Sequence, residues 1–86
     1  MRPVKFKIND KTHTLPSRAV KVSKIFELNG MDSPKWPDYE VMWIAENGFR
    51  VFFTDHREEM AVYDGMNLKI LNKSMRRNND RTPHVP

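Results

Sequence analysis

The chain contains no cysteine, only three glycines and no long apolar run. Without cysteine it has no disulfide, no thiol nucleophile and no Cys-ligated zinc site. Its glycines stand far apart along the sequence, so it has no glycine-rich loop that could cradle a phosphate group. The apolar stretches are only a few residues long, too short to span a bilayer or to serve as a secretory signal. We therefore expect a cytoplasmic protein without a membrane partner.

The residues that are present suffice for one small hydrophobic core. Of the 86 residues, 38% are hydrophobic and 30% are charged, and the aromatic residues comprise five Phe, two Trp and two Tyr. This composition is typical of one folded domain, not of a disordered chain. We assign residues 1–72 to a single small globular domain. Residues 73–86 are expected to form a basic tail that is disordered when alone, because they are mostly polar and contain two prolines near their end.

Charge is unevenly distributed along the chain, although the net charge is only +4. Residues 1–24 hold seven basic residues and one acidic residue, and residues 73–86 hold four and one. Residues 25–72 hold four basic and nine acidic residues. This segregation favours a basic surface made by the two ends of the chain, against an acidic middle.

A hairpin is the most specific local prediction. Within residues 40–55, two runs rich in β-branched and aromatic residues are separated by Asn47-Gly48, a sequence typical of a two-residue type I′ turn. That register gives an apolar core face and a second face on which Trp43, Phe52 and Arg50 lie together. The second face is either another core layer or a binding platform. The core face would hold Ile44–Val51 and Met42–Phe53, and the second face Ala45–Arg50, Trp43–Phe52 and Val41–Thr54.

The N-terminal third predicts strands with one ambiguous segment. Val4, Phe6 and Ile8 alternate with lysines, as in a half-buried strand, and a turn at 9–11 allows a second strand over 12–15. Residues 17–29 favour a strand, but a helix between a Ser17 N-cap and Gly30 is the alternative.

The remaining segments predict a loop, a short helix and a last strand. Two prolines within 29–38 exclude a regular helix, and Trp36 on this loop is expected to pack over the edge of the core. Asp55 and Glu58 resemble a capping box that starts a short helix through Tyr63, whereas Met60 and Val62 could instead belong to a strand. A closing strand is expected over 68–71.

These elements predict a mainly β fold, with a β-rich α+β fold possible. We expect a small antiparallel sheet or a partly open barrel, with the Asn-Gly hairpin at its centre and at most one or two short helices. Whether the chain forms oligomers is left open, because an unpaired edge strand could also make a dimer.

Catalytic chemistry finds little support in the sequence. His56 lies among the carboxylates of Asp55, Glu58 and Glu59, a combination that could bind a divalent metal or act as a base. Helix capping and solvated charge explain the same residues, and no second histidine lies at ligand spacing. No serine occurs in a nucleophile-elbow motif. We therefore expect a protein that is not an enzyme and has no metal or cofactor.

The combination of basic and aromatic residues favours nucleic-acid binding. In small β-sheet proteins, cations follow the backbone of a single strand while aromatic rings stack on its bases. The type of nucleic acid, DNA or RNA, is left open. The residues predicted to bind it are Lys5, Lys7, Lys21, Lys24, Arg50, Trp43, Phe52, Lys73, Arg76 and Arg77.

A protein-interaction module, either an inhibitor or an adaptor, is the alternative. Aromatic, Met and Arg side chains are enriched in interface cores, and this chain has many of them. The partner would be a larger protein, for example one that itself processes nucleic acid. On this hypothesis the contact residues are Trp36, Trp43, Glu58 and Glu59.

Overall fold

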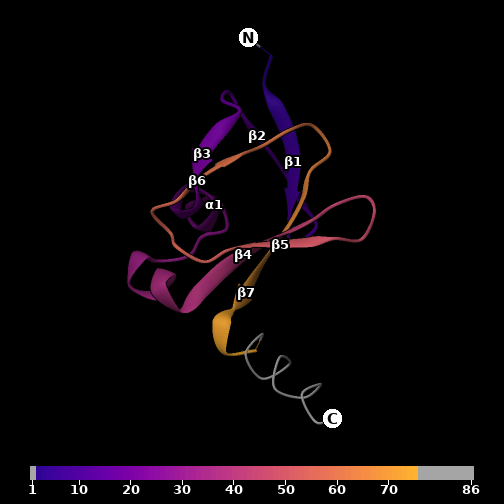
Figure 1. Cartoon of the computed structure of the whole chain (residues 1–86). Helices are drawn as coiled ribbons and strands as arrows, with labels where there is room; N and C mark the ends of the chain where they lie inside the picture. Colours follow the sequence, from indigo (N-terminus) through magenta and orange to yellow (C-terminus); the bar gives the residue numbers. More distant parts are fainter. Residues whose placement is uncertain (1, 76–86) are drawn as a thin grey trace, which may run out of the picture.

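The structure, a computed structural model, describes residues 2–75 (Figure 1). This part of the chain is mostly β, as the composition and alternation predicted, with the helix α1, a 3₁₀ helix and a few helical residues at 73–75. In chain order the elements are β1 (Val4–Ile8), β2 (Lys11–Leu15), β3 (Ala19–Lys21), α1 (Val22–Leu28), η1 (Ser33–Asp38), β4 (Tyr39–Ile44), β5 (Arg50–Phe53), β6 (Glu59–Ala61) and β7 (Asn67–Asn72).

Five strands form one mixed sheet in the order β2-β1-β7-β4-β5. The prediction of an antiparallel sheet is wrong at one pair, because β1 and β7 run parallel, while the other neighbours are antiparallel. Within residues 2–75 the sheet does not close into a barrel, since β2 and β5 are its two ends. The middle strand is β7, so β4 and β5 lie toward one edge instead of at the centre.

A two-residue turn joins β1 to β2. The residues of β1 alternate between buried and exposed, as their sequence predicted, and Ile8 pairs with Lys11 across the turn. Asn9 and Asp10 have φ angles of 49° and 71°. A type I′ turn needs positive φ at both central positions, so the tight turn that we predicted at Asn47-Gly48 is found here instead.

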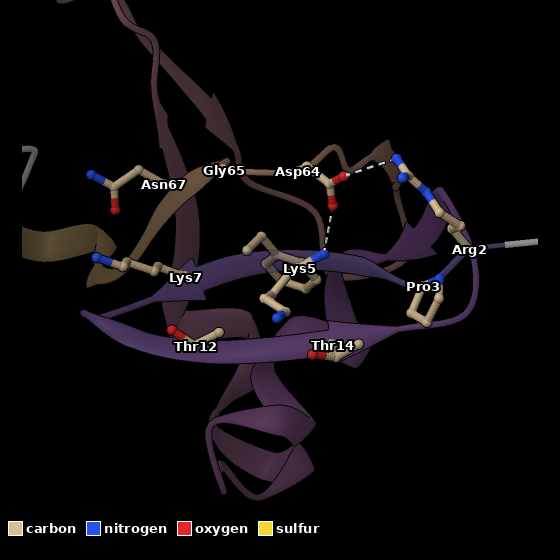
Figure 2. Close-up of a pocket in the computed structure, with 10 residues that line it drawn as sticks. Arg2, Pro3, Lys5, Lys7, Thr12, Thr14, Asp64, Gly65 and Asn67 are labelled. Atoms are coloured by element: carbon tan, nitrogen blue, oxygen red, sulfur yellow. Dashed lines mark hydrogen bonds and ion pairs between the residues drawn. The ribbon is translucent and has the colours of Figure 1, made fainter.

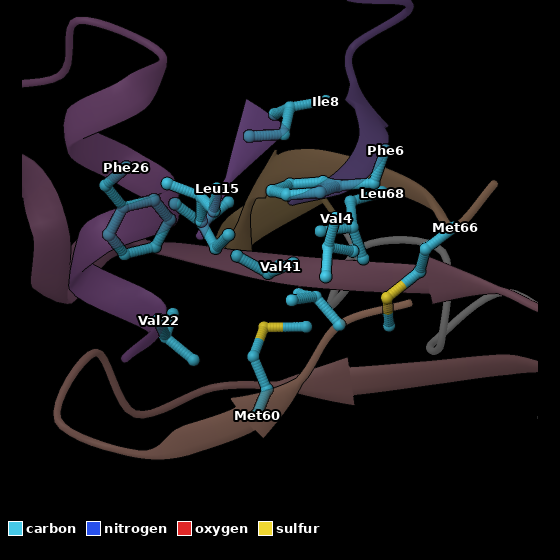
Figure 3. Close-up of a cluster of buried hydrophobic side chains, with 12 residues drawn as sticks. Val4, Phe6, Ile8, Leu15, Val22, Phe26, Val41, Met60, Met66 and Leu68 are labelled. Atoms are coloured by element: carbon cyan, nitrogen blue, oxygen red, sulfur yellow. The ribbon is translucent and has the colours of Figure 1, made fainter. Parts of the chain in front are cut away.

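The second layer covers one face of the sheet, which we call the core face. It consists of α1, η1 and a two-stranded antiparallel ribbon of β3 and β6. Val22 and Phe26 of α1 and Met60 of β6 belong to the same buried cluster as Val41 of β4 (Figure 3). The buried core comprises Val4, Phe6, Ile8, Leu15, Val22, Ile25, Phe26, Val41, Met60, Val62, Met66 and Leu68.

Residues 17–29 contain both of the alternatives that the sequence offered. A short strand, β3, leads directly into α1, and the predicted C-terminal Gly30 has a φ of +76°. The Ser17 N-cap is wrong, because the helix begins at Val22 and the side chain of Ser17 instead bonds to Ala19. The first helical amides, those of Val22 and Ser23, donate to the carbonyls of Glu58 and His56 at 2.9 Å. Backbone from a distant turn therefore satisfies this helix end.

That turn replaces the short helix predicted after Asp55. Asp55 Oδ1 accepts hydrogen bonds from the Arg57 amide at 2.9 Å and from Arg57 Nε at 3.1 Å, and the Glu58 amide donates to the Asp55 carbonyl. The hydrogen bonds from the Arg57 side chain, and then from its amide, lower the pKa of Asp55 from 3.8 to about 2. The chain continues as β6, with Met60 and Val62 buried, so the strand alternative describes this segment.

The β4–β5 connection has a different register from the one predicted. The Ala45 amide donates to the Phe49 carbonyl and the Gly48 amide to the Ala45 carbonyl, both at 2.9 Å. Three residues, 46–48, therefore form the loop, and Gly48 has a φ of +92°, as in a type I turn followed by a G1 bulge. The observed pairs are Val41–Phe53, Met42–Phe52, Trp43–Val51 and Ile44–Arg50.

This one-residue shift exchanges the two faces of β5 relative to β4. Val41, Trp43 and Phe53 face the core, whereas Met42 and Phe52 lie on the opposite side. The predicted core pairs Ile44–Val51 and Met42–Phe53 are therefore wrong, as is the pairing of Trp43 with Phe52.

Within the described residues, no helix is long and apolar enough to cross a membrane.

Candidate nucleic-acid interface

The sheet face that points away from the core carries a second, polar set of side chains. The strand registers align them in rows that run across the sheet, for example Thr12–Lys7–Asn67–Ile44–Arg50. We call this the outer face. Its members are Thr12 and Thr14 of β2, Lys5 and Lys7 of β1, Asn67, Lys69 and Leu71 of β7, Glu40, Met42 and Ile44 of β4, and Arg50 and Phe52 of β5.

The two halves of the outer face differ in access to solvent. Around β1 and β2, Lys5, Lys7, Thr12 and Thr14 are all exposed. On β4, by contrast, Glu40 is 0% exposed and Met42 is 7% exposed. A macromolecule could therefore contact the β1–β2 half directly, and this half is the better candidate for a binding site.

A broad open hollow of about 1030 Å³ lies on this half (Figure 2). Lys5 and Lys7 of β1 run along it, with the threonines of β2 on one side and the chain from 64 to 67 on the other. Gly65 lines the hollow at a φ of +85°, a backbone conformation that favours glycine. The lining residues are Arg2, Pro3, Lys5, Phe6, Lys7, Thr12, Thr14, Asp64, Gly65 and Asn67.

The electrostatics of the hollow are predominantly positive. Arg2, Lys5 and Lys7 bring three cations, and Asp64 brings one carboxylate. Asp64 Oδ1 accepts a hydrogen bond from the Lys5 amide at 2.9 Å, and Asp64 Oδ2 lies 3.9 Å from Arg2 Nη2. The acid is therefore held at one end of the hollow, and Lys7 with Asn67 is at the other.

Four of the residues predicted to bind nucleic acid lie on the outer face. Lys5, Lys7 and Arg50 are exposed there, and Phe52 is half-buried. The sequence analysis did not predict four further residues of this face: Lys69, Thr12, Thr14 and Asn67. Lys69 is half-buried on β7, and β7 lies between β1, which carries Lys7, and β5, which carries Arg50. The alternation of Leu68, Lys69 and Ile70 was the signal for Lys69, because it matches that of β1.

The structure separates other members of the predicted set from this face. Trp43 packs against the core, and its Nε1 donates to the Tyr63 hydroxyl at 2.8 Å. Lys21 on β3 and Lys24 on α1 belong to the second layer, on the far side of the core from Lys5 and Lys7. The predicted platform of Trp43 and Phe52 beside Arg50 is therefore wrong, because these two rings occupy opposite faces of the sheet.

The C-terminal members of the set are only partly placed. Lys73 directly follows β7 and is half-buried. Arg76 and Arg77, with the rest of the predicted tail from 76 to 86, lie outside the described residues.

The residues of the alternative hypothesis differ in their exposure to solvent. Trp36 packs against the core edge as predicted; its Nε1 donates to the Met31 carbonyl at 3.1 Å, and its ring lies 5.6 Å from that of His56. Glu58 and Glu59 are both exposed. Glu58 lies on the turn before β6, and Glu59 is the first residue of β6. Among residues 2–75, no cluster of three or more His, Asp or Glu side chains could hold a metal ion.

Comparisons with protein-family models, curated proteins and solved structures find no match. The fold and the hollow define a small β-rich domain with a basic sheet face, and the chemistry of that face carries the functional argument.

Proposed function

We propose that this protein is a non-enzymatic nucleic-acid-binding module whose site is the basic half of the outer face. The observation that carries the proposal is the alignment of Lys5 and Lys7 with exposed threonines around one open hollow. Lysines attract phosphate groups, while hydroxyl and amide side chains exchange hydrogen bonds with phosphate and sugar oxygens. The same residue types recur where a protein holds a nucleic-acid backbone without catalysing a reaction.

The shape of the site favours a single strand over a duplex. Direct readout of duplex DNA uses a helix or a β-ribbon that enters the major groove. The outer face instead offers a hollow between strands, into which the sugar and phosphate of an extended strand can settle. Lys69 and Arg50 continue the positive charge across the sheet beyond the hollow. A strand that crosses β1, β7, β4 and β5 would meet each of these cations in turn.

The test is the salt dependence of binding to a fluorescently labelled single-stranded oligonucleotide. With three or four phosphate contacts, the plot of log K against log salt concentration has an expected slope of about −2 to −3. Lys5→Gln with Lys7→Gln removes two contacts and makes the slope shallower by about 1.4. Lys21→Gln with Lys24→Gln removes the same charge from the second layer and is expected to leave the slope unchanged.

Two results would contradict the proposal. The first is an affinity that does not change with salt. The second is an equal effect of the two double substitutions, because net charge alone would then explain binding.

A protein-interaction module is a second candidate, favoured by a different surface. Phe49 is 70% exposed, Tyr63 is 42% exposed and Val51 is 38% exposed. Val51 lies opposite Trp43, which bonds to Tyr63, so these side chains gather on the core side near the end of the β4–β5 hairpin. Exposed apolar clusters of this kind mark docking surfaces. Recovery of one stoichiometric protein from nuclease-treated lysate, lost in Phe49→Ser, would support this function, and no change in recovery would contradict it.

A further inference from the structure

The hollow on the outer face contains one acidic side chain that phosphate binding alone does not explain. Asp64 lines the hollow together with Arg2, Lys5 and Lys7. A carboxylate repels phosphate groups, so a site that bound only phosphate would gain from its absence. Asp64 nevertheless has its own fixed position, because the Lys5 amide donates to Oδ1 and Arg2 lies near Oδ2.

The carboxylate keeps free capacity to accept hydrogen bonds. Two carboxylate oxygens offer about four acceptor sites, and Oδ1 uses one of these on the Lys5 amide. The Asp64 side chain is 62% exposed, and its contact with Arg2 is 3.9 Å long. Asp64 can therefore accept a further hydrogen bond from a group that enters the hollow.

The two ends of the hollow suit different parts of a nucleotide. The Lys7 end, with Thr12 and Asn67 on either side in the same row, offers a cation and polar side chains to a phosphate. The Asp64 end offers a negatively charged acceptor, which favours a hydroxyl donor. Phosphate and sugar alternate along a nucleic-acid strand, so one unit can satisfy both ends at once.

We infer that this hollow recognises ribose, and that the ligand class of the proposed site is single-stranded RNA. The Asp64 carboxylate accepts a hydrogen bond from a ribose 2′-hydroxyl while Lys7 holds the neighbouring phosphate. The 2′-hydroxyl is the group by which proteins distinguish RNA from DNA, and deoxyribose has no donor at that position. This inference depends on the proposed nucleic-acid-binding function, because it names the ligand of the same site.

The experiment compares uridine decamers that differ only in the sugar: ribose, deoxyribose or 2′-O-methyl ribose. The unaltered protein is expected to bind the ribose strand about fivefold more tightly than either of the others, as for one exposed hydrogen bond to a charged group. The 2′-O-methyl strand keeps the oxygen but lacks the donor, so it is expected to bind like the deoxyribose strand.

Asp64→Asn provides the matched variant. The asparagine Oδ1 can still accept the Lys5 amide, so the local fold is retained, and circular dichroism with a thermal melt checks this directly. The ribose preference is expected to fall toward one, because the neutral amide is a weaker acceptor for the 2′-hydroxyl than the carboxylate. The loss of repulsion between Asp64 and phosphate acts on all three strands alike and leaves their ratio unchanged. Asp32→Asn, on the loop before η1, makes the same chemical change away from the hollow and is expected to keep the preference.

The outcomes separate this inference from the proposed function. Equal affinity of the unaltered protein for all three strands would overturn ribose recognition, and so would a fivefold preference that persists in Asp64→Asn. In either case the salt-dependent binding through Lys5 and Lys7 could still be observed, and the proposed function would stand. If the unaltered protein bound none of the three strands, both ribose recognition and the proposed nucleic-acid-binding function would be contradicted.

Discussion

Asn9 and Ile70 are joined by a hydrogen bond of 3.0 Å, in which the Ile70 amide donates to the Asn9 side-chain oxygen. The backbone amides of Lys7 and Asn9 donate to the carbonyls of Met66 and Leu68 in the same pair of strands. At the other end of β1, the Lys5 amide donates to the Asp64 side chain. Two side chains therefore extend the short parallel ladder between β1 and β7 at both of its ends.

Substitution of Asn9 is expected to weaken this ladder measurably. Asn9→Gly removes only the acceptor for Ile70 and should lower the free energy of unfolding by about 1 kcal/mol. Asn9→Ala also forces an alanine into a positive φ, which adds about 1–2 kcal/mol. Urea unfolding measures both variants. Equal losses in the two variants would show that the backbone at Asn9 is not strained.

The β4–β5 register can be tested by an introduced disulfide, because the chain has no cysteine of its own. Ala45 and Phe49 form a hydrogen-bonded pair, so alternation makes Met42 and Phe52 a close non-hydrogen-bonded pair, with Cα atoms about 4.5 Å apart. That spacing suits a disulfide. Met42→Cys with Phe52→Cys is therefore expected to cross-link on oxidative refolding, as judged by mass spectrometry.

The control pair is Met42→Cys with Phe53→Cys, which is the pairing that a two-residue Asn47-Gly48 turn would create. In the structure these two positions face opposite sides of the sheet, so this pair is expected to remain reduced. A cross-link in the control and none in the first pair would show that the register is wrong.

The Trp43–Tyr63 contact joins the hairpin to the segment after β6. The indole N–H donates to the Tyr63 hydroxyl, and the two rings meet edge to face with their centroids 6.0 Å apart. Tyr63→Phe keeps the ring contact and removes the acceptor, so it is expected to lower the free energy of unfolding by about 1 kcal/mol. Tyr63→Ala should lower it further. If Tyr63→Phe unfolds at the same urea concentration as the unaltered protein, the hydrogen bond contributes nothing to stability.

The Asp55–Arg57 turn predicts a defined pH dependence. The pKa of Asp55 is lowered from 3.8 to about 2 in the folded state, so its contribution to stability is present above pH 4 and is lost as the pH falls toward 2. Arg57→Gln removes the side-chain hydrogen bonds and returns the pKa toward its usual value. The unaltered protein should therefore melt at a higher temperature than Arg57→Gln at pH 6, and the difference should shrink as the pH falls from about 4 through about 2. A difference that is constant across this range would contradict the assignment.

Local patterns in the sequence predicted the strands better than their arrangement. Val4, Phe6 and Ile8 alternate with lysines, and this alone predicts β1 with its buried side. Asn47-Gly48 is compatible with a two-residue or a three-residue loop, because in both a glycine adopts positive φ. The choice between them moves every side chain of β5 to the other face. Nothing local predicts that β1 and β7 pair, because the contact joins segments distant in sequence.

The candidate site was predictable only where it depends on single strands. Outward lysines on β1 follow from alternation, and Arg50 was also placed correctly beside Phe52. The hollow itself needs β2, β1 and the chain around Asp64 to meet, and the roles of Thr12, Thr14 and Asn67 appear only then. Trp43 was assigned to the site through the register error, so that part of the prediction failed together with the hairpin.

The position of β7 has a consequence for how this molecule is made. The middle strand of the sheet is separated by 61 residues from the turn that it binds, as the Asn9–Ile70 contact shows. During synthesis on the ribosome, the β1–β2 hairpin therefore emerges long before β7, the strand with which β1 pairs in the folded sheet. During that interval the edge of β1 that later pairs with β7 has no partner strand, and the nascent protein is then most exposed to aggregation.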